Sequence, residues 1–415
     1  MISPAPSDLI FDWNRAHDDL PTRKSVHVVD ETLYEADHAP SCGPLDEGGM
    51  AELIDAMRAL GVHEVDLGAL TETSAPRITR LARICERPSS PMEMRCVISS
   101  DDDGLALAAR LADQVGSGIR FALVVHASEL HQRAAGLSPQ AAHSALRRTL
   151  EKAVRHGLTT RLLLHDAARA RPAGLRRLVE AAVDAGVTHF CLWDCAGQSS
   201  PSGVRRLLAF VRGILAEHPG AHHLGWFGRN DRDLALANAL EAVFHGADTL
   251  HAAALGVGHG AGNIPLDLLL ANLLLLDVIE ADLTTLKRYC DIAARTCGIV
   301  IPVNYPIVGR DAFRTATGVH AAAIIKARDK GDHWLADRVY SSMPAGLFGL
   351  RQIIDVGPMS GESNVVAWLE QHQITPHMGL VRAILARAKA SMRTLAPQDM
   401  FEEVRAFRET AGTSC

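Results

Sequence analysis

The sequence predicts an α/β protein built on a parallel (β/α)8 TIM barrel, followed by a smaller, mainly helical accessory region. Short runs rich in β-forming residues alternate with longer amphipathic segments from near residue 26 to near residue 278. Alternation of this kind predicts parallel strands joined by helices, and its eight repeats fit a closed barrel better than an open sheet. After residue 280 the alternation stops, and helical segments joined by proline-containing linkers follow.

The expected strands are short and mostly apolar. They span residues 26–29, 64–67, 94–98, 119–125, 161–164, 189–193, 223–227 and 249–253. Helical patterns lie between them, near residues 46–60, 73–85, 102–115, 138–156, 171–185, 201–217, 231–245 and 263–278. In this fold the chemistry lies at the C-terminal ends of the strands, so the residues that follow each strand are the candidates for a site.

We expect three regions along the chain. Residues 25–280 form the barrel, which would be the catalytic domain. Residues 281–415 form the accessory region, with helical patterns near 283–296, 311–328, 364–372 and 376–394. Residues 1–24 show no period, so they are either an arm on the surface or at a subunit contact, or a loose terminus.

Composition and charge exclude several classes of protein. The 415 residues are 47% hydrophobic and carry a formal net charge of −6, without a long Lys/Arg block, which argues against nucleic-acid binding. The longest apolar stretch, 266–279, contains Asp267 and Asp277, so no membrane association is expected. The eight cysteines form no CxxC pair, which predicts reduced thiols in a cytoplasmic protein.

A glycine-rich loop, GVGHGAGN at residues 256–263, follows the last expected strand. It superficially resembles a dinucleotide-binding fingerprint, which would favour a doubly wound nucleotide-binding fold. That fingerprint follows the first strand of its fold rather than the last, so the barrel remains the better prediction.

Four stretches resemble the motifs of a known family, the DRE-TIM metallolyases, which includes 2-isopropylmalate synthase, homocitrate synthase and hydroxymethylglutaryl-CoA lyase. DETLYEADH at residues 30–38 is similar to D-x-T-L-R-[DE]-G-x-Q, and DCAGQSSP at 194–201 is similar to D-T-x-G-x-x-x-P. Residues 227–238, FGRNDRDLALAN, are similar to H-x-H-N-D-x-G-x-A-x-A-N, and residues 256–263 are similar to G-x-G-E-R-x-G-N. The resemblance covers about residues 25 to 370 and implies a metal-dependent enzyme that makes or breaks carbon–carbon bonds.

The departures from these motifs fall on functional positions. In the family, the acid of the first motif, both histidines of H-x-H and often the asparagine of the glycine loop bind a divalent metal. Here these positions hold Glu35, Phe227, Arg229 and Asn263. A phenyl ring cannot coordinate a metal and a guanidinium has no lone pair to give, so a metal at this position is doubtful. The family's catalytic arginine is Tyr34 here.

Further substitutions follow the same pattern. His38 replaces the glutamine of the first motif, Cys195 replaces a threonine, and His165 replaces the acid that usually precedes Asp166. The Glu-Arg pair of the glycine loop has become His259-Gly260. Cys195 could be a nucleophile if its pKa were depressed, and otherwise it is a small residue lining the pocket.

Two interpretations of these substitutions stay open. In the first, the site has been rebuilt: Arg229 pairs with Glu35, or it grips a carboxylate and stabilises an enolate in place of the metal. In the second, the barrel is a catalytically silent ligand-binding or partner subunit. A relocated metal bound by Glu35 and Asn263 with His38, His165 or His259, or with His126, is a further alternative, although no local ligand spacing supports it.

The accessory region also resembles the condensing synthases, through PIVG at 306–309, GVH at 318–320 and SG at 360–361. The resemblance implies that His320, often with a downstream tyrosine such as Tyr340, moves a proton from an acyl group. It also implies a homodimer, and the chain is too short after Asn364 for the feedback-regulatory domain of long isopropylmalate synthases.

The sequence therefore predicts an enzyme similar to the homocitrate and isopropylmalate synthases, acting on an oxo acid or another small carboxylate substrate, with acyl-CoA as a possible co-substrate. Such divergence suits secondary metabolism, and no cofactor is certain. The expected catalytic residues are Arg229, Tyr34, Glu35, His320 and Tyr340. The expected substrate-binding residues are His38, Arg95, His165, Cys195, Asn230, Asp231, His259 and Asn263.

Overall fold

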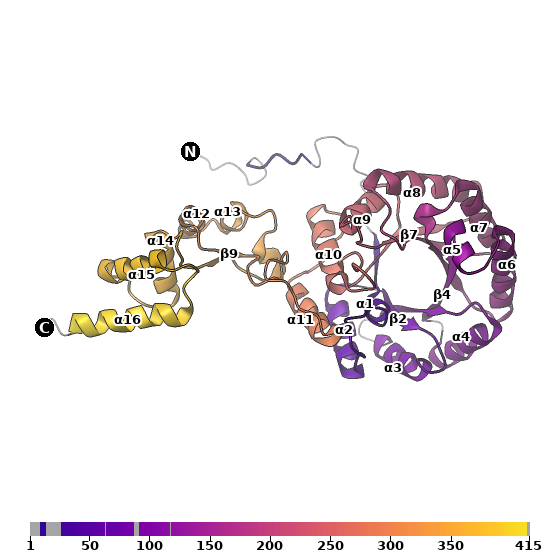
Figure 1. Cartoon of the computed structure of the whole chain (residues 1–415), viewed down its shortest axis with the longest axis horizontal. Coiled ribbons are helices and arrows are strands. Elements are labelled where there is room, and N and C mark those ends of the chain that lie inside the picture. The colour runs from indigo at the N-terminus through magenta and orange to yellow at the C-terminus, as the bar shows by residue number, and fades with distance from the viewer. Residues whose placement is uncertain (1–8, 14–25, 63, 87–90, 117, 413–415) are drawn as a thin grey trace. The chain divides into compact units, whose positions relative to one another are not determined.

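The computed structural model describes residues 9–13, 26–62, 64–86, 91–116 and 118–412 (Figure 1). These residues fall into two compact units: the barrel unit, Asp12–Val300, and the accessory unit, which holds the chain from Ile301. Most of the arm expected over residues 1–24 lies outside the described residues.

A closed barrel of parallel strands forms the centre of the barrel unit, which confirms the predicted fold (Figure 1). Pairing follows the order of the chain, and β1 closes the barrel against β8, with His27 opposite Thr249. The strands are β1 His27–Asp30, β2 Glu64–Ala69, β3 Glu93–Ile98, β4 Ile119–His126, β5 Thr160–His165, β6 His189–Asp194, β7 His223–Gly228 and β8 Thr249–Ala252.

Helices surround the barrel (Figure 1). Several begin where the sequence provides a capping side chain: Asp46, Asp101 and Ser138 each accept a hydrogen bond from a main-chain N–H of the first turn. The helices of this unit are α1 Thr32–Ala36, α2 Glu47–Ala59, α3 Ala75–Cys85, α4 Asp102–Val115, α5 Glu129–Ala134, α6 Pro139–Arg155, α7 Pro172–Asp184, α8 Pro201–Ala216, α9 Ala235–Phe244, α10 Leu266–Leu275 and α11 Leu286–Cys297.

Two short helices, α1 and α5, were not predicted. Each follows a strand directly, α1 after β1 and α5 after β4. With five and six residues they are too short to show a helical period in the sequence. Both carry side chains into the C-terminal end of the barrel, so they matter for the site.

Side chains alternate between the barrel interior and the helical layer along each strand. On β7, Gly225 and Phe227 face the interior, whereas Trp226 is fully buried on the other side. A Cβ at Gly225 would lie 3.2 Å from Nε2 of His251 on β8, so the glycine makes room for that ring.

The barrel unit extends to Val300 rather than to residue 280. Helix α11 packs on α2, and the Tyr289 hydroxyl donates a hydrogen bond of 2.6 Å to Asp30 Oδ2 on β1. The alternation of strands and helices in the sequence ends near residue 280, but α11 still packs on the barrel and belongs to the same unit.

The accessory unit is mainly helical and has its own apolar core. Val365, Leu369, Val381 and Ile384 pack together in its larger cluster. Its elements are β9 Arg314–Thr315, α12 Gly318–Asp329, α13 His333–Arg338, β10 Ile353–Ile354, α14 Glu362–Gln371, α15 Met378–Ala390 and α16 Pro397–Gly412, with β9 and β10 paired in parallel.

A search of the described residues for a membrane span finds no helix with the length and apolar character needed to cross a bilayer.

Tyr289 links the last helix of the barrel unit to its first strand, so its loss should destabilise the unit. Asp30 is fully buried, and burial raises its pKa to about 6 while the hydrogen bonds from Thr32 and Tyr289 oppose that rise. Tyr289→Phe should lower the free energy of unfolding by about 1–3 kcal/mol in urea denaturation, because it removes a donor to a buried carboxyl. Tyr340→Phe, a change at a 49% exposed side chain, is the control and should change that value by less than about 0.5 kcal/mol.

Candidate functional site

Glu35 lies in α1 at the C-terminal mouth of the barrel, and it is 4% exposed. Its carboxyl is hydrogen-bonded to the Asn263 side chain and lies against Gly258, where an added Cβ would approach Oε2 to 2.7 Å. Burial raises the pKa of Glu35 to about 7, although the Asn263 hydrogen bond opposes the rise. The group is therefore poised to gain or lose a proton near neutral pH.

Aromatic rings cover the adjoining side of the mouth. His165 on β5, Trp193 on β6, Phe227 on β7 and His251 on β8 follow one another around the barrel. Their ring centroids are 4.8 Å, 5.1 Å and 6.1 Å apart in that order. Phe227 is 3% exposed and lies in the middle of this row, so its position holds packed apolar surface.

Arg229 follows β7 and is partly exposed at the mouth. Its Nη1 donates to the main-chain oxygen of Cys195 at 3.3 Å, and its Nη2 contacts both the main-chain oxygen and Nδ1 of His259. No ion pair joins Arg229 to Glu35 among the described residues, so the predicted pair is not formed. Among the described residues, the guanidinium is held by two main-chain oxygens and the His259 ring, and it forms no ion pair with a carboxylate.

The four residues at the family's metal position do not fit a divalent metal. Phe227 offers no donor atom, and Arg229 offers only N–H groups. The Asn263 amide donates to the main-chain oxygen of Val257 at 3.0 Å and also bonds Glu35. One carboxylate and one already engaged amide are a poor ligand set for any transition metal or for Mg²⁺.

Tyr34 and His38 lie together on α1 and just after it. Their ring centroids are 4.5 Å apart, and His38 Nδ1 contacts the main-chain oxygen of Tyr34 at 2.7 Å. Burial, with the charges of Asp66 and Glu35, raises the pKa of the Tyr34 phenol, which therefore remains a hydrogen-bond donor.

Three histidines meet at the ends of β4 and β5. His126 and His165 are paired neighbours in the sheet, and His131 reaches them from α5. Burial lowers the pKa of His126, and burial with the charges of His131 and His126 lowers the pKa of His165 to about 4. His131 was not predicted, because its proximity depends on the short helix α5.

The structure does not assemble the relocated metal site that the sequence left open as an alternative. No set of Glu35 with His38, His165 or His259 brings its ligand atoms within 4.8 Å of one another among the described residues. His38 is engaged with Tyr34 and His259 with Arg229. Of the expected histidines, the structure brings together only His126 and His165.

Cys195 lies beside His165, with Sγ 3.7 Å from His165 Nδ1. Burial and the nearby Asp166 carboxylate raise the pKa of the Cys195 thiol to about 12. A protonated thiol is a weak nucleophile, which favours the interpretation of Cys195 as a lining residue.

Asn230, Asp194 and Asn238 from the family motifs hold loops in place. The main-chain N–H groups of Gln198 and Ser199 donate to Asp194 at 3.0 Å and 2.8 Å. Asn230 Oδ1 accepts from Ala235 at the start of α9, and Asn238 donates to the Ser199 main chain. Asp231, predicted to bind substrate, is exposed beside them.

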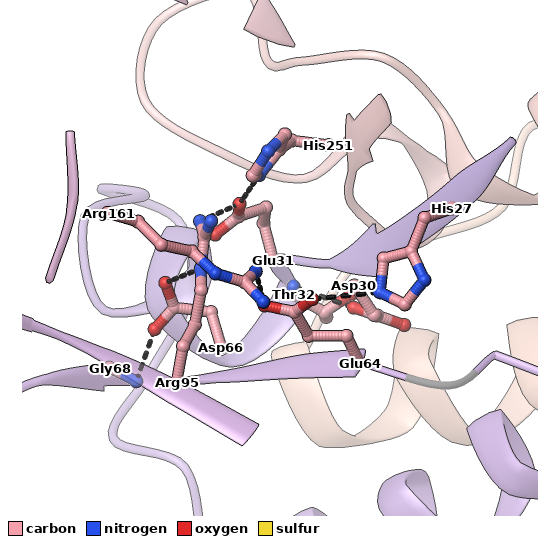
Figure 2. A network of polar contacts seen from close by, with 10 residues as sticks. All are labelled: His27, Asp30, Glu31, Thr32, Glu64, Asp66, Gly68, Arg95, Arg161 and His251. Atoms are coloured by element: carbon pink, nitrogen blue, oxygen red, sulfur yellow. Dashed lines mark hydrogen bonds and ion pairs between the residues drawn. The ribbon is translucent and has the colours of Figure 1, made fainter. Parts of the chain in front are cut away.

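Arg95 lies inside the barrel in a buried ion network (Figure 2). Its Nε donates to Asp66 at 2.9 Å, its Nη2 pairs with Glu31, and Glu31 also contacts His251 Nδ1 at 2.6 Å. Burial raises the pKa of both carboxyls, and the guanidinium opposes that rise. Arg95, suggested by the sequence as a substrate-binding residue, is 2% exposed with its charge matched by two acids, which indicates a structural role.

A second buried pair lies nearby (Figure 2). Glu64 on β2 pairs with Arg161 on β5 and contacts His27 at 2.8 Å. Burial would raise the pKa of Glu64, but His27 and Arg161 lower it well below its usual range. The alternation of Glu64 and Asp66 within one buried strand was the available sequence signal for these interior charges.

The accessory unit brings its two predicted residues into contact. His320 on α12 and Tyr340 after α13 have ring centroids 3.9 Å apart. Their part in catalysis stays a prediction.

Comparison with known proteins identifies relatives of the chain. The HMGL-like family profile matches residues 26–294. A homocitrate synthase from Pyrococcus abyssi is 31% identical over 181 residues, 43% of this chain and 47% of that protein, so the match spans about half of that relative. The homocitrate synthase AksA of Methanopyrus kandleri is 27% identical over 386 residues, 90% of this chain and 88% of that protein. The hydroxymethylglutaryl-CoA lyase of Pseudomonas aeruginosa shares the fold, with a TM-score of 0.57 and 18% identity over 68% of this chain and 95% of that one.

Arg95 should be essential for stability. Arg95→Leu leaves two buried carboxyl groups without their cation, so the free energy of unfolding in urea should fall by about 3–5 kcal/mol. The matched control is Arg110→Leu, which removes a surface pair with Glu72 at side chains 54% and 79% exposed and should cost less than about 1 kcal/mol. An equal effect of the two changes would contradict the structural role of the network.

Glu35 should make stability depend on pH. Between the ordinary glutamate pKa of 4.5 and the raised pKa of about 7, the folded chain binds more protons at Glu35 than the unfolded chain, so this contribution to stability falls as pH rises. Glu35→Gln should therefore match the parent near pH 4.5 and exceed it by up to about 3 kcal/mol near pH 8, measured by urea unfolding across pH. A stability difference between Glu35→Gln and the parent that stays flat across this pH range would rule out the raised pKa.

Proposed function

The chain belongs to the HMGL-like family, and we propose that it makes or breaks a carbon–carbon bond in a Claisen- or aldol-type reaction on an oxo acid or a related small carboxylate. The matched curated relatives are named homocitrate, citramalate and isopropylmalate synthases, which supports an enzyme of the acyltransferase or lyase type. Acyl-CoA is the proposed co-substrate in the synthase direction, and a homodimer is the proposed assembly.

The observation that supports this proposal is the uncancelled charge of Arg229. Two loops orient the guanidinium through the main-chain oxygens of Cys195 and His259. A fixed cation at a barrel mouth can bind a carboxylate and stabilise the negative charge that develops on an enolate oxygen. In this proposal Arg229 performs both tasks without a metal at the family's position.

Other residues complete the reaction. A base removes a proton from the carbon beside the acyl carbonyl, and the enolate carbon attacks the oxo carbon to form the new bond. The resulting alkoxide then takes up a proton. By resemblance to the family, we assign the role of the base to His320 with Tyr340. We assign the role of hydrogen-bond donor to the enolate oxygen to Tyr34, whose phenol stays protonated because its pKa is raised.

Glu35 is the proposed proton carrier for the alkoxide. It is buried, forms no ion pair within the described part of the chain, and has a pKa of about 7. A carboxyl group with this pKa can donate and regain a proton at neutral pH, which an ordinary glutamate does not do efficiently. The changes at the family's functional positions favour a different substrate, and we place the reaction in secondary metabolism.

A catalytically silent barrel is the second candidate, favoured by the packed aromatic row at the former ligand position. The two candidates differ in turnover. Oxo acids should raise the melting temperature in both cases, whereas a panel of oxo acids with acyl-CoAs should give product only if the chain is an enzyme.

Arg229→Ala should lower turnover by about 100-fold or more, because removing one oxyanion-stabilising donor costs that much in other enzymes. Arg229→Lys should retain part of the activity, since it keeps the charge but loses the planar fork. The control is Arg232→Ala, at an exposed neighbour that donates to the Gln198 main chain. Full turnover by Arg229→Ala in steady-state assays, with the parent active, would falsify the proposed role of this cation.

A further inference from the structure

The imidazoles of His126, His131 and His165 form a compact cluster, which we call the histidine triad. One ring nitrogen from each lies within 4.8 Å of those of the other two. The ring centroids are 5.8 Å apart for His126 and His131, 5.7 Å for His126 and His165, and 4.8 Å for His131 and His165. All three side chains are partly exposed, so solvent and ions reach them.

The spacing of the triad is close to that of metal ligands. Nitrogens bound to tetrahedral zinc at 2.0–2.1 Å lie about 3.3 Å from each other. His131 Nδ1 and His165 Nδ1 are 2.9 Å apart, and one ring nitrogen of His126 completes a set whose ligand atoms all lie within 4.8 Å of one another. Two of the three nitrogens are thus close to the spacing of metal ligands, and the third lies near them.

The backbone that carries the triad is fixed. His126 and His165 are opposite one another in the paired strands β4 and β5. His131 belongs to α5, whose first turn is capped by Ser128: the His131 main-chain N–H donates to Ser128 Oγ at 3.1 Å. The position of the ligands is thus set by the barrel and not by a loose loop.

One atom of the triad has no protein partner. Nδ1 of His126 is buried and makes no hydrogen bond among the described residues. A buried ring nitrogen without a partner is costly unless a water or an ion satisfies it. A water or an ion bound beside the His126 ring would satisfy this atom.

Neighbouring charges are compatible with a cation. Arg169 approaches His131 Nε2 to 3.3 Å, but its own charge is paired with Asp166 at 2.7 Å. Asp166 and Cys195 also form an overlapping set with His131 whose ligand atoms lie within 4.8 Å of one another. The surroundings thus contain a balancing carboxylate and a further soft donor.

A second cluster of possible metal ligands in the barrel differs from the triad because an arginine already occupies it. His27, Glu64 and Glu93 are equally close, but Arg161 already lies between the two acids, pairing with Glu64 and approaching Glu93 to 3.5 Å. That cluster contains its own cation. The triad consists of imidazoles alone.

We propose that the histidine triad binds one transition-metal ion of the Zn²⁺ type and leaves its fourth coordination position open to the mouth of the barrel. Imidazole ligands favour Zn²⁺, Co²⁺, Ni²⁺ and Cu²⁺ over Mg²⁺ and Ca²⁺. The site uses different strands from the family's metal position, at β4 and β5 instead of β1, β7 and β8. It does not rest on the reaction proposed above.

The bound ion would lie beside the proposed site of reaction. Cys195 connects the two places, since its main-chain oxygen accepts from Arg229 and its Sγ lies 3.7 Å from His165 Nδ1. A carboxylate at the mouth would then meet a fixed guanidinium on one side and a metal with an open position on the other.

The test is metal binding by the full chain, with any affinity tag removed and metals stripped by a chelator. Titration with Co²⁺ should give one ion per chain and the visible absorption of a four-coordinate, nitrogen-ligated ion, and Zn²⁺ should displace it. Mg²⁺ should not compete. Each of His126→Asn, His131→Asn and His165→Asn should weaken Co²⁺ binding at least tenfold. If one of these variants fails to fold, a tenfold loss in a variant that does fold is sufficient support.

Control variants locate the ion. His38→Asn removes another histidine at the mouth, and Arg229→Ala removes the proposed catalytic cation; both should bind Co²⁺ as the parent does. The proposal is overturned if the parent binds no Co²⁺, if the folded triad variants bind it unchanged, or if Glu35→Gln and Asn263→Ala abolish binding, which would place the ion at the family's position. Because no outcome depends on turnover, failure here is distinct from failure of the proposed reaction.

Discussion

The buried ion pair of Arg95 with Glu31 and Asp66 is the interaction on which the barrel mouth depends. It joins β3 to β2 and to the residue that follows β1, and Glu31 continues it to His251 on β8. Burying these three ionisable groups is costly, so the network is stable only when all its members are present. Since Glu31 directly precedes α1, the same interaction fixes the helix that presents Tyr34 and Glu35.

The motif residues that remain from the family serve this framework. Asp30 receives the Tyr289 hydroxyl, and Thr32 Oγ1 accepts from the Ala254 main chain at 2.8 Å. Gly258 leaves room for Glu35 and Asn263, since a Cβ there would clash with both. These residues hold the loops whether or not a metal binds. This explains how the chain can keep these motif residues although the residues at the ligand positions differ from those of the family.

Much of the fold could be predicted from the sequence, and less of the site. All the barrel strands could be predicted from short apolar runs, because a parallel strand that is buried on both faces has a nearly continuous apolar sequence. The helix α5 is too short to show a period, so His131 could not be placed beside His126 and His165. The pairing of His126 with His165 depends on strand register, which alternation alone does not give. Arg95 was expected to bind substrate, because the sequence did not show that Glu31 and Asp66 face it.

The raised pKa of Glu35 has its physical cause in the surroundings of the carboxyl group. A carboxylate is ionised in a buried site when a cation compensates its charge, and here the carboxyl group is buried against the Asn263 amide and forms no ion pair among the described residues. Arg229 lies near enough to lower the pKa slightly but is held by the Cys195 and His259 main chains. Glu35, at the position where the family has a metal ligand, therefore titrates near neutral pH. The chemistry of Glu35 is therefore set by the residues that surround it as much as by its own side chain.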